Sequence, residues 1–157
     1  MTARSVVHGT FTIQRHWKAS PQRVFDAFAT QSGKAKWFAP GVERLESRFD
    51  FREGGQEVLQ GKHPSGNGMV SRFDCLYRDI VPPAGGEAGR IVYSYGMHLD
   101  GRKISVSQAC IEIRPDGGGT RLMLREDGVF LDGYDDNGSR EHGTNWLMDM
   151  LGKSLES

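Results

Sequence analysis

The sequence has few cysteines and no long apolar run, and both shortages narrow the classes of protein it can be. Its two cysteines, Cys75 and Cys110, lie apart in strand-like segments and form neither a C-x-x-C pair nor a disulfide framework. We expect both to be buried, reduced thiols that pack as small apolar side chains. No apolar stretch approaches the roughly 20 residues that cross a bilayer, and the opening MTARSVVHGTFTIQ lacks the apolar run of a signal peptide. A cytoplasmic protein with no membrane partner is therefore expected.

An excess of charge of either sign is also missing. The chain carries 20 Lys+Arg and 20 Asp+Glu, and its basic residues are scattered. A protein that binds a phosphate backbone gathers positive charge on one surface, so nucleic acid is not an expected partner. The 157 residues are most simply a single domain, spanning 1–157, which is large enough for a sizeable core or for a core with a hollow in it.

Motifs of common catalytic and nucleotide-binding sites are absent as well. The chain contains no G-x-S-x-G, G-x-G-x-x-G, G-x-x-x-x-G-K-[ST] or H-E-x-x-H. Its five histidines are too dispersed for a local metal motif, so neither a metal nor a cofactor is expected. Catalytic residues stay unassigned, although Glu126, His98 and His142 could perform acid–base chemistry if they converge at a pocket mouth. The alternative is that Glu126 pairs with Arg125, Arg140 or water and that both histidines lie on the surface.

What the sequence does contain is an ordered series of strands and helices. The segment GTFTIQRHW alternates with the period of a half-buried strand. Ser20 and Pro21 then suit the N-cap and first position of a helix with an apolar face, and a second short helix is predicted over 31–36. About six further strands follow, separated by turns such as PPAGGEAG and PDGGG, and the first two flank the hairpin signal Gly54-Gly55. This spacing favours an antiparallel meander.

The last segment of the chain predicts a long helix. Ser139 is the expected N-cap, and Glu141 is expected in the first turn, where the helix dipole favours an acid. Helical spacing then predicts one apolar stripe along this helix, made of Gly143, Trp146, Leu147, Met150, Leu151 and Ser154.

Strand periodicity places small and aromatic side chains on the inward face of the predicted sheet. In ISVSQACIEIRP, Ile111 and Ile113 alternate with charged residues, so the same face should carry the small residues Ser105, Ser107 and Ala109. Neighbouring segments should add aromatic, thioether and carboxylate groups to that face, namely Ile91, Tyr93, Tyr95, Met97, Leu122, Leu124 and Glu126. A concave, mostly apolar surface with a few polar groups is typical of a small-molecule site. A filled core, in which both tyrosine hydroxyls have internal partners, fits the same pattern.

Four segments, taken in order, resemble a known family: WKASPQRVFDAFATQSGKAKWFAP, FDFREGGQ, YSYGMHLDGRKISV and GVFLDGYDDNGSREHGTNWLMDMLGKSL. They are similar to the bacterial branch of the activator of heat-shock-protein-90 ATPase homologue-like family, in the START and birch-pollen-allergen (SRPBCC) superfamily. The resemblance covers roughly residues 10–155. It implies an α+β helix-grip fold, in which a curved antiparallel sheet of six to seven strands wraps around the C-terminal helix. It also implies two short helices at one end and a hydrophobic cavity between sheet and helix.

This resemblance implies a protein that binds a small hydrophobic or aromatic molecule in that cavity. The alternatives are an enzyme of unknown reaction with a polar group at the cavity mouth, and a protein-interaction module. ATPase-stimulating relatives carry a further N-terminal domain for which this chain has no room, which argues against a chaperone partner, whereas a homodimer stays possible through sheet edges. Gly143 would keep the cavity open, unless it serves close packing of the helix on the sheet. The expected cavity residues are Tyr93, Tyr95, Met97, Ser105, Ser107, Ala109, Leu124, Glu126, Phe130, His142, Gly143, Trp146 and Met150.

Overall fold

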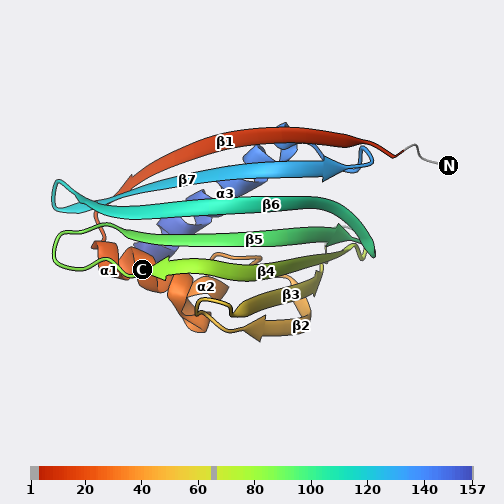
Figure 1. Ribbon diagram of the computed structural model, residues 1–157. Coiled ribbons are helices and arrows are strands. Elements are labelled where there is room, and N and C mark those ends of the chain that lie inside the picture. Colours follow the sequence, from red (N-terminus) through yellow and green to blue (C-terminus); the bar gives the residue numbers. More distant parts are fainter. Residues whose placement is uncertain (1–3, 65–66, 157) are drawn as a thin grey trace.

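A computed structural model describes residues 4–64 and 67–156 of the chain. The elements are, in order, β1 (Val6–Trp17), α1 (Pro21–Ala29), α2 (Gln31–Ala35), β2 (Glu43–Phe49), β3 (Gln56–Lys62), β4 (Val70–Val81), β5 (Gly89–Leu99), β6 (Arg102–Asp116), β7 (Gly119–Leu131) and α3 (Asn137–Leu155). The strands form one antiparallel sheet of order β1-β7-β6-β5-β4-β3-β2. The sheet curls without closing, and α3 crosses one of its faces (Figure 1). The predicted helix-grip fold and order of elements are confirmed.

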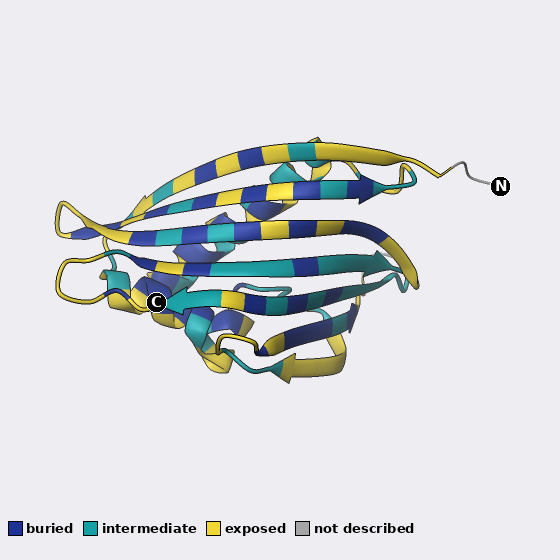
Figure 2. Cartoon of the chain, in the orientation of Figure 1, coloured by how far each residue is buried: buried dark blue, intermediate teal, exposed yellow. Residues whose placement is uncertain are grey.

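Alternating burial along the strands shows which face of the sheet meets the helices. Figure 2 shows buried and exposed residues alternating along β6 and β7. Ser105, Ser107, Ala109, Ile111 and Ile113 are all buried, as their shared parity predicts. The residues between them, such as the exposed Val106 and Gln108, lie on the opposite face. Because a strand turns successive side chains to opposite faces, one apolar series is enough to orient each strand.

The first helix and the first hairpin follow the local signals in their sequence. Ser20 Oγ accepts a hydrogen bond from the Arg23 backbone N–H at 3.2 Å, and Pro21 is the first residue of α1. At the β2–β3 hairpin Gly54 has a φ of +80°, which few other residues adopt. A Cβ on the neighbouring Gly55 would lie 2.1 Å from the Asp50 carbonyl oxygen, so no side chain fits there.

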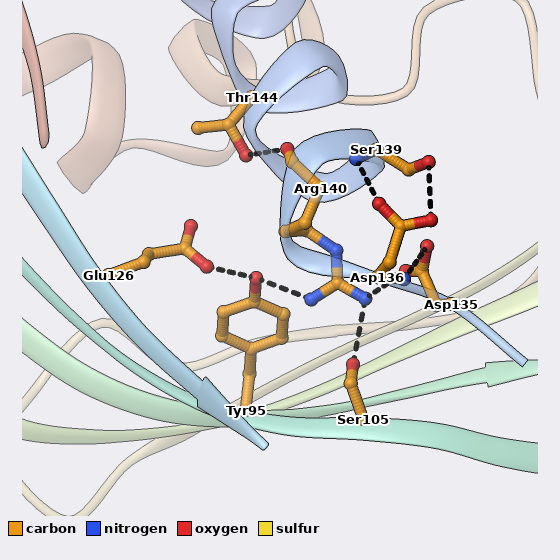
Figure 3. Close-up of polar contacts among 8 residues, drawn as sticks. All are labelled: Tyr95, Ser105, Glu126, Asp135, Asp136, Ser139, Arg140 and Thr144. Atoms are coloured by element: carbon orange, nitrogen blue, oxygen red, sulfur yellow. Dashed lines mark hydrogen bonds and ion pairs between the residues drawn. The ribbon is translucent and has the colours of Figure 1, made fainter. Parts of the chain in front are cut away.

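The start of α3 differs from the prediction. Its N-cap is Asp136, whose side chain accepts a hydrogen bond from the Ser139 backbone N–H at 2.8 Å, so Ser139 is the third helical residue and not the cap (Figure 3). Glu141 consequently lies beyond the first turn. Both residue types are good caps, and the carboxylate has the added advantage of a negative charge at the positive end of the helix dipole. The hydrogen bonds from Ser139 lower the pKa of Asp136.

The buried stripe of α3 also differs from the predicted one. Trp146 is 50% exposed, and Leu147 and Met150 are only partly buried. The indole of Trp17, on β1, lies against the buried face near the end of α3, where a Cβ on Gly152 would lie 2.8 Å from Trp17 Nε1. The residues that α3 buries are Thr144, Met148, Leu151, Gly152 and Leu155.

The two cysteines have different environments. Both are free, and Cys75 is buried as predicted, where burial raises the pKa of its thiol to about 12. Cys110 is only half-buried, which corrects the prediction for this residue. It lies on β6 between the buried Ala109 and Ile111, so its side chain points to the outer face of the sheet.

Candidate functional site

A pocket of about 340 Å³ lies between the concave face of the sheet, α3 and the segment that runs from α1 to β2. Most of its wall is apolar or aromatic. α1 and the segment after α2 contribute Phe28, Trp37 and Phe38, the sheet contributes Leu59, Phe73, Met97 and Leu124, and α3 contributes Trp146, Leu147 and Met148. Side chains therefore do not fill all of the space between α3, the sheet and the segment that runs from α1 to β2.

Three aromatic rings of neighbouring strands form one wall of the pocket. Phe73 lies on β4, and Tyr93 and Tyr95 lie on β5. The ring centroid of Phe73 is 6.4 Å from that of Tyr93 and 5.0 Å from that of Tyr95, and the two tyrosine rings are 5.9 Å apart. Burial strongly raises the pKa of the Tyr93 hydroxyl, and within the described part of the chain this hydroxyl forms no hydrogen bond.

A chain of polar contacts connects this wall to the first turns of α3 (Figure 3). The Tyr95 hydroxyl donates to Glu126 Oε1 at 2.6 Å and accepts from Arg140 Nη1 at 3.0 Å. Arg140 Nη2 donates to Ser105 Oγ at 2.7 Å and to Asp135 Oδ2 at 2.9 Å. Glu126 is 4% exposed, and this burial raises the pKa of its carboxyl although the Tyr95 hydrogen bond and the Arg140 charge act in the opposite direction.

The same contacts explain why the small residues of β6 do not line the pocket. Tyr95 on β5 reaches across β6 to Glu126 on β7, so its ring lies above that strand. The Arg140 guanidinium lies 5.7 Å from the Tyr95 ring centroid and 5.5 Å from that of Phe130. Long side chains from other elements thus fill the room that short ones leave, and four expected cavity residues lie buried beneath them, outside the pocket wall: Ser105, Ser107, Ala109 and Phe130.

The other expected cavity residues divide between the pocket wall and its surroundings. Those in the wall are Tyr93, Tyr95, Met97, Leu124, Glu126, Gly143 and Trp146. A Cβ on Gly143 would have no atom within 4 Å, so this glycine faces open space and does not serve close packing. His142 is exposed and Met150 packs against the core, and both lie outside the wall. That any of these residues binds a ligand stays a prediction.

Glu126 does not converge with His98 and His142, so the acid–base arrangement that the sequence left open does not form. His98 lies on the outer face of the sheet, where its Nδ1 is 3.7 Å from Asp74 Oδ2. His142 lies on the exposed side of α3, away from the pocket. Of the two arginines considered as partners of Glu126, Arg125 pairs with Asp127 and Arg140 pairs with Asp135, and the hydrogen bond to Glu126 comes from Tyr95.

A second buried polar cluster was missed by the sequence analysis. Lys34 Nζ lies 2.5 Å from Glu57 Oε1, which also accepts a 2.5 Å hydrogen bond from the Tyr77 hydroxyl. Lys34 and Glu57 are 6% and 5% exposed, and the ammonium lies 4.7 Å from the Phe38 ring centroid. The signal was present in β3, since Glu57 has the parity of the inward-facing Leu59.

Over residues 4–64 and 67–156, no three His, Cys, Asp or Glu side chains come close enough together to hold a metal ion. None of the helices in this part of the chain has the length and apolar character to cross a membrane.

Comparison with known proteins agrees with the fold. The profile of the family described as Activator of Hsp90 ATPase homolog 1-like protein matches residues 18–156. The chain belongs to this family. Among curated proteins none matches it.

Solved structures of several bacterial proteins resemble this member of the Activator of Hsp90 ATPase homolog 1-like family. The Mll3558 protein from Rhizobium loti is 41% identical, with a TM-score of 0.84 over 96% of this chain and 99% of its own. An uncharacterised protein from Rhizobium leguminosarum is 38% identical, with a TM-score of 0.86 over 99% of both chains. Protein CV1439 from Chromobacterium violaceum, at 24% identity and a TM-score of 0.76 over 94% of this chain and 97% of its own, shares the fold.

Proposed function

We propose that this protein binds a small hydrophobic or aromatic molecule in the pocket between the sheet and α3. The family accommodates ligand-binding and chaperone-related proteins, and one observation supports the first. The pocket of about 340 Å³ falls in the size range of small-molecule sites and has a mostly apolar wall. It also has few polar groups, of which Glu126 and Tyr93 retain unused hydrogen-bonding capacity.

Gly143 allows the proposal to be tested without disturbing the core. Gly143 is exposed and belongs to the pocket wall, so a leucine at this position would extend into open space, where we expect it to obstruct part of the pocket. Because glycine is about 1 kcal/mol less favourable than alanine inside a helix, neither Gly143→Leu nor Gly143→Ala should unfold the protein. The alanine variant is the matched control, since it adds one carbon to the same position.

The measurement is the fluorescence of the neutral apolar probe prodan during titration with each protein. We expect a blue-shifted, saturable signal with the parent, affinity within about twofold of the parent for Gly143→Ala, and a loss of about tenfold or more for Gly143→Leu, which excludes several apolar contacts. Binding that is unchanged in Gly143→Leu would place the probe outside this pocket. No saturable binding by the parent would contradict the proposed function for molecules of this class.

A further inference from the structure

The charged side chains that line the pocket leave one carboxylate without a cation. Lys34 is paired with Glu57, and Arg140 is paired with Asp135. Within residues 4–64 and 67–156, Glu126 forms no ion pair, and its one hydrogen bond is the one that Oε1 accepts from Tyr95. Figure 3 shows the second carboxylate oxygen pointing away from Tyr95.

An unpaired carboxylate at this depth is costly to ionise. Glu126 is 4% exposed, so most of the water that would stabilise its charge has been removed. The other buried glutamate of the pocket region, Glu57, has a lysine in contact with it. A ligand that brings a positive charge and N–H donors to Glu126 Oε2 would give Glu126 the cationic hydrogen-bond partner that Lys34 gives to Glu57.

The surroundings of Glu126 favour a cation as well. Tyr93, Ala109 and Glu126 occupy one row across β5, β6 and β7, because Ala109 is the register partner of both. This row places the Cα atoms of Tyr93 and Glu126 about 10 Å apart, with a methyl group between them. The faces of aromatic rings attract cations, and the Tyr93 hydroxyl has a free lone pair for a further N–H. An anionic group would meet the negative charge of Glu126 with the pocket's two cations already paired.

We propose that the pocket selects an amphipathic amine, whose ammonium group binds Glu126 Oε2 beside Tyr93 and whose apolar body packs against the aromatic wall. This inference rests on the proposed function, because it identifies the class of ligand that the same pocket holds. Lys34 pairs with Glu57 and Arg140 with Asp135, and Arg140 reaches Glu126 only through the Tyr95 hydroxyl, so Glu126 is the carboxylate left to contact a charged ligand.

The test compares three probes that share one apolar body and differ in charge. These are 1-naphthylmethylamine, 1-naphthylmethanol and 1-naphthoate, each titrated into the full-length protein at neutral pH by isothermal calorimetry. We expect the amine to bind about tenfold or more tightly than the alcohol, since a hydrogen bond between charged groups is stronger than one to a neutral group. The carboxylate should bind most weakly.

Two variants assign this preference to Glu126. Glu126→Gln keeps the shape of the side chain and an oxygen that accepts from Tyr95, so it should lower amine affinity to the level of the alcohol and leave alcohol affinity within about twofold. Glu141→Gln is the control, because it removes the same charge from a side chain outside the pocket wall. It should retain the preference for the amine.

Each result decides one of the two proposals. An amine that binds the parent no more tightly than the alcohol, or a carboxylate that binds best, overturns the inference and leaves the proposed function intact. Equal losses of amine and alcohol affinity in Glu126→Gln also overturn it, because they indicate a structural role. Failure of all three probes to bind the parent contradicts both. The comparison of probes on the parent decides the charge preference even if the variant does not fold.

Discussion

Two comparisons within the molecule show the same difference: the buried glutamates Glu57 and Glu126, and the α3 glycines Gly152 and Gly143. In each comparison the first residue is enclosed by protein atoms and the second faces the pocket. Glu57 contacts a lysine and a tyrosine hydroxyl, whereas Glu126 has one hydrogen bond and an open side. Gly152 is covered by the Trp17 indole, whereas Gly143 faces open space. The same residue type therefore serves the stability of the fold in one region and leaves room for a ligand in the other.

The difference is between buried groups whose partners are all supplied by the protein and buried groups that still lack a partner. A buried charge is tolerated when its partner and hydrogen bonds are all present, and removal of one partner is then expensive. An incomplete site costs stability in the free protein and can recover that cost on binding. Substitutions in the enclosed region should thus lower the free energy of unfolding, and substitutions facing the pocket should raise it or leave it unchanged.

The largest effect is expected from Lys34→Met. This substitution leaves Glu57 buried without its cation, and it should lower the free energy of unfolding by about 3–5 kcal/mol in urea denaturation at neutral pH. Lys36→Met, at an exposed position two residues later, should change it by less than about 0.5 kcal/mol.

A double variant sharpens the same point. Lys34→Met with Glu57→Leu removes both charges and should recover most of the loss, because an apolar pair can replace a buried ion pair at little cost. If Lys34→Met alone behaved like Lys36→Met, the enclosed pair would contribute no more than a surface ion pair, and the contrast with Glu126 would fail.

The second effect is expected at Gly152. A methyl group there would lie 2.8 Å from Trp17 Nε1 and must displace the indole. Overpacking of this kind costs about 1–3 kcal/mol, and the gain in helix propensity offsets part of it, so Gly152→Ala should lower the free energy of unfolding by about 1–2 kcal/mol. A change in Trp17 fluorescence should accompany the loss. A stabilised variant would show that the indole moves aside freely.

Local patterns predicted the order of elements and an antiparallel sheet, and the family resemblance implied the helix-grip fold, but neither predicted the shape of the site. Ser20, Pro21 and the Gly54-Gly55 turn act through neighbouring residues, so the sequence around them determined their structure. The face that α3 buries includes Gly152, which contacts Trp17, a residue remote in sequence, and neither the helical period nor the cap residues indicate that contact. The position of the pocket depends on Tyr95, which fills the space above Ser107 from another strand.

The parity that placed Glu126 inward was nevertheless correct, and its burial was predictable for that reason. Its hydrogen-bond partner was not, because Tyr95 reaches it from β5, across β6, whereas Arg125 and Arg140 pair with other carboxylates. Residue spacing thus predicts which side chains share a face, while long side chains from other elements decide which of them border empty space.

The third prediction concerns the pH dependence that Glu126 gives to stability. Burial raises the pKa of its carboxyl in the folded protein above the ordinary value of 4.5, so the folded state binds this proton more tightly than the unfolded state. As pH rises from the ordinary pKa through the raised one, the parent should lose stability relative to Glu126→Gln. Urea denaturation of both proteins at about pH 4.5 and about pH 8 tests this. If the parent kept its stability relative to Glu126→Gln, or gained stability relative to it, as the pH rises, Glu126 would be compensated like Glu57.

The smallest effect is expected at Gly143 and has the opposite sign to that at Gly152. Gly143→Ala adds a methyl group that meets no atom within 4 Å, in the interior of a helix where glycine is unfavourable. The free energy of unfolding should therefore rise by about 0.5–1 kcal/mol, measured beside Gly152→Ala under the same conditions. If Gly143→Ala is stabilising, glycine is not required at this position for folding. The open space beside it would then explain why glycine is present. A destabilising one would show that protein atoms occupy that space, and the distinction between the enclosed and the pocket-facing glycine would be lost.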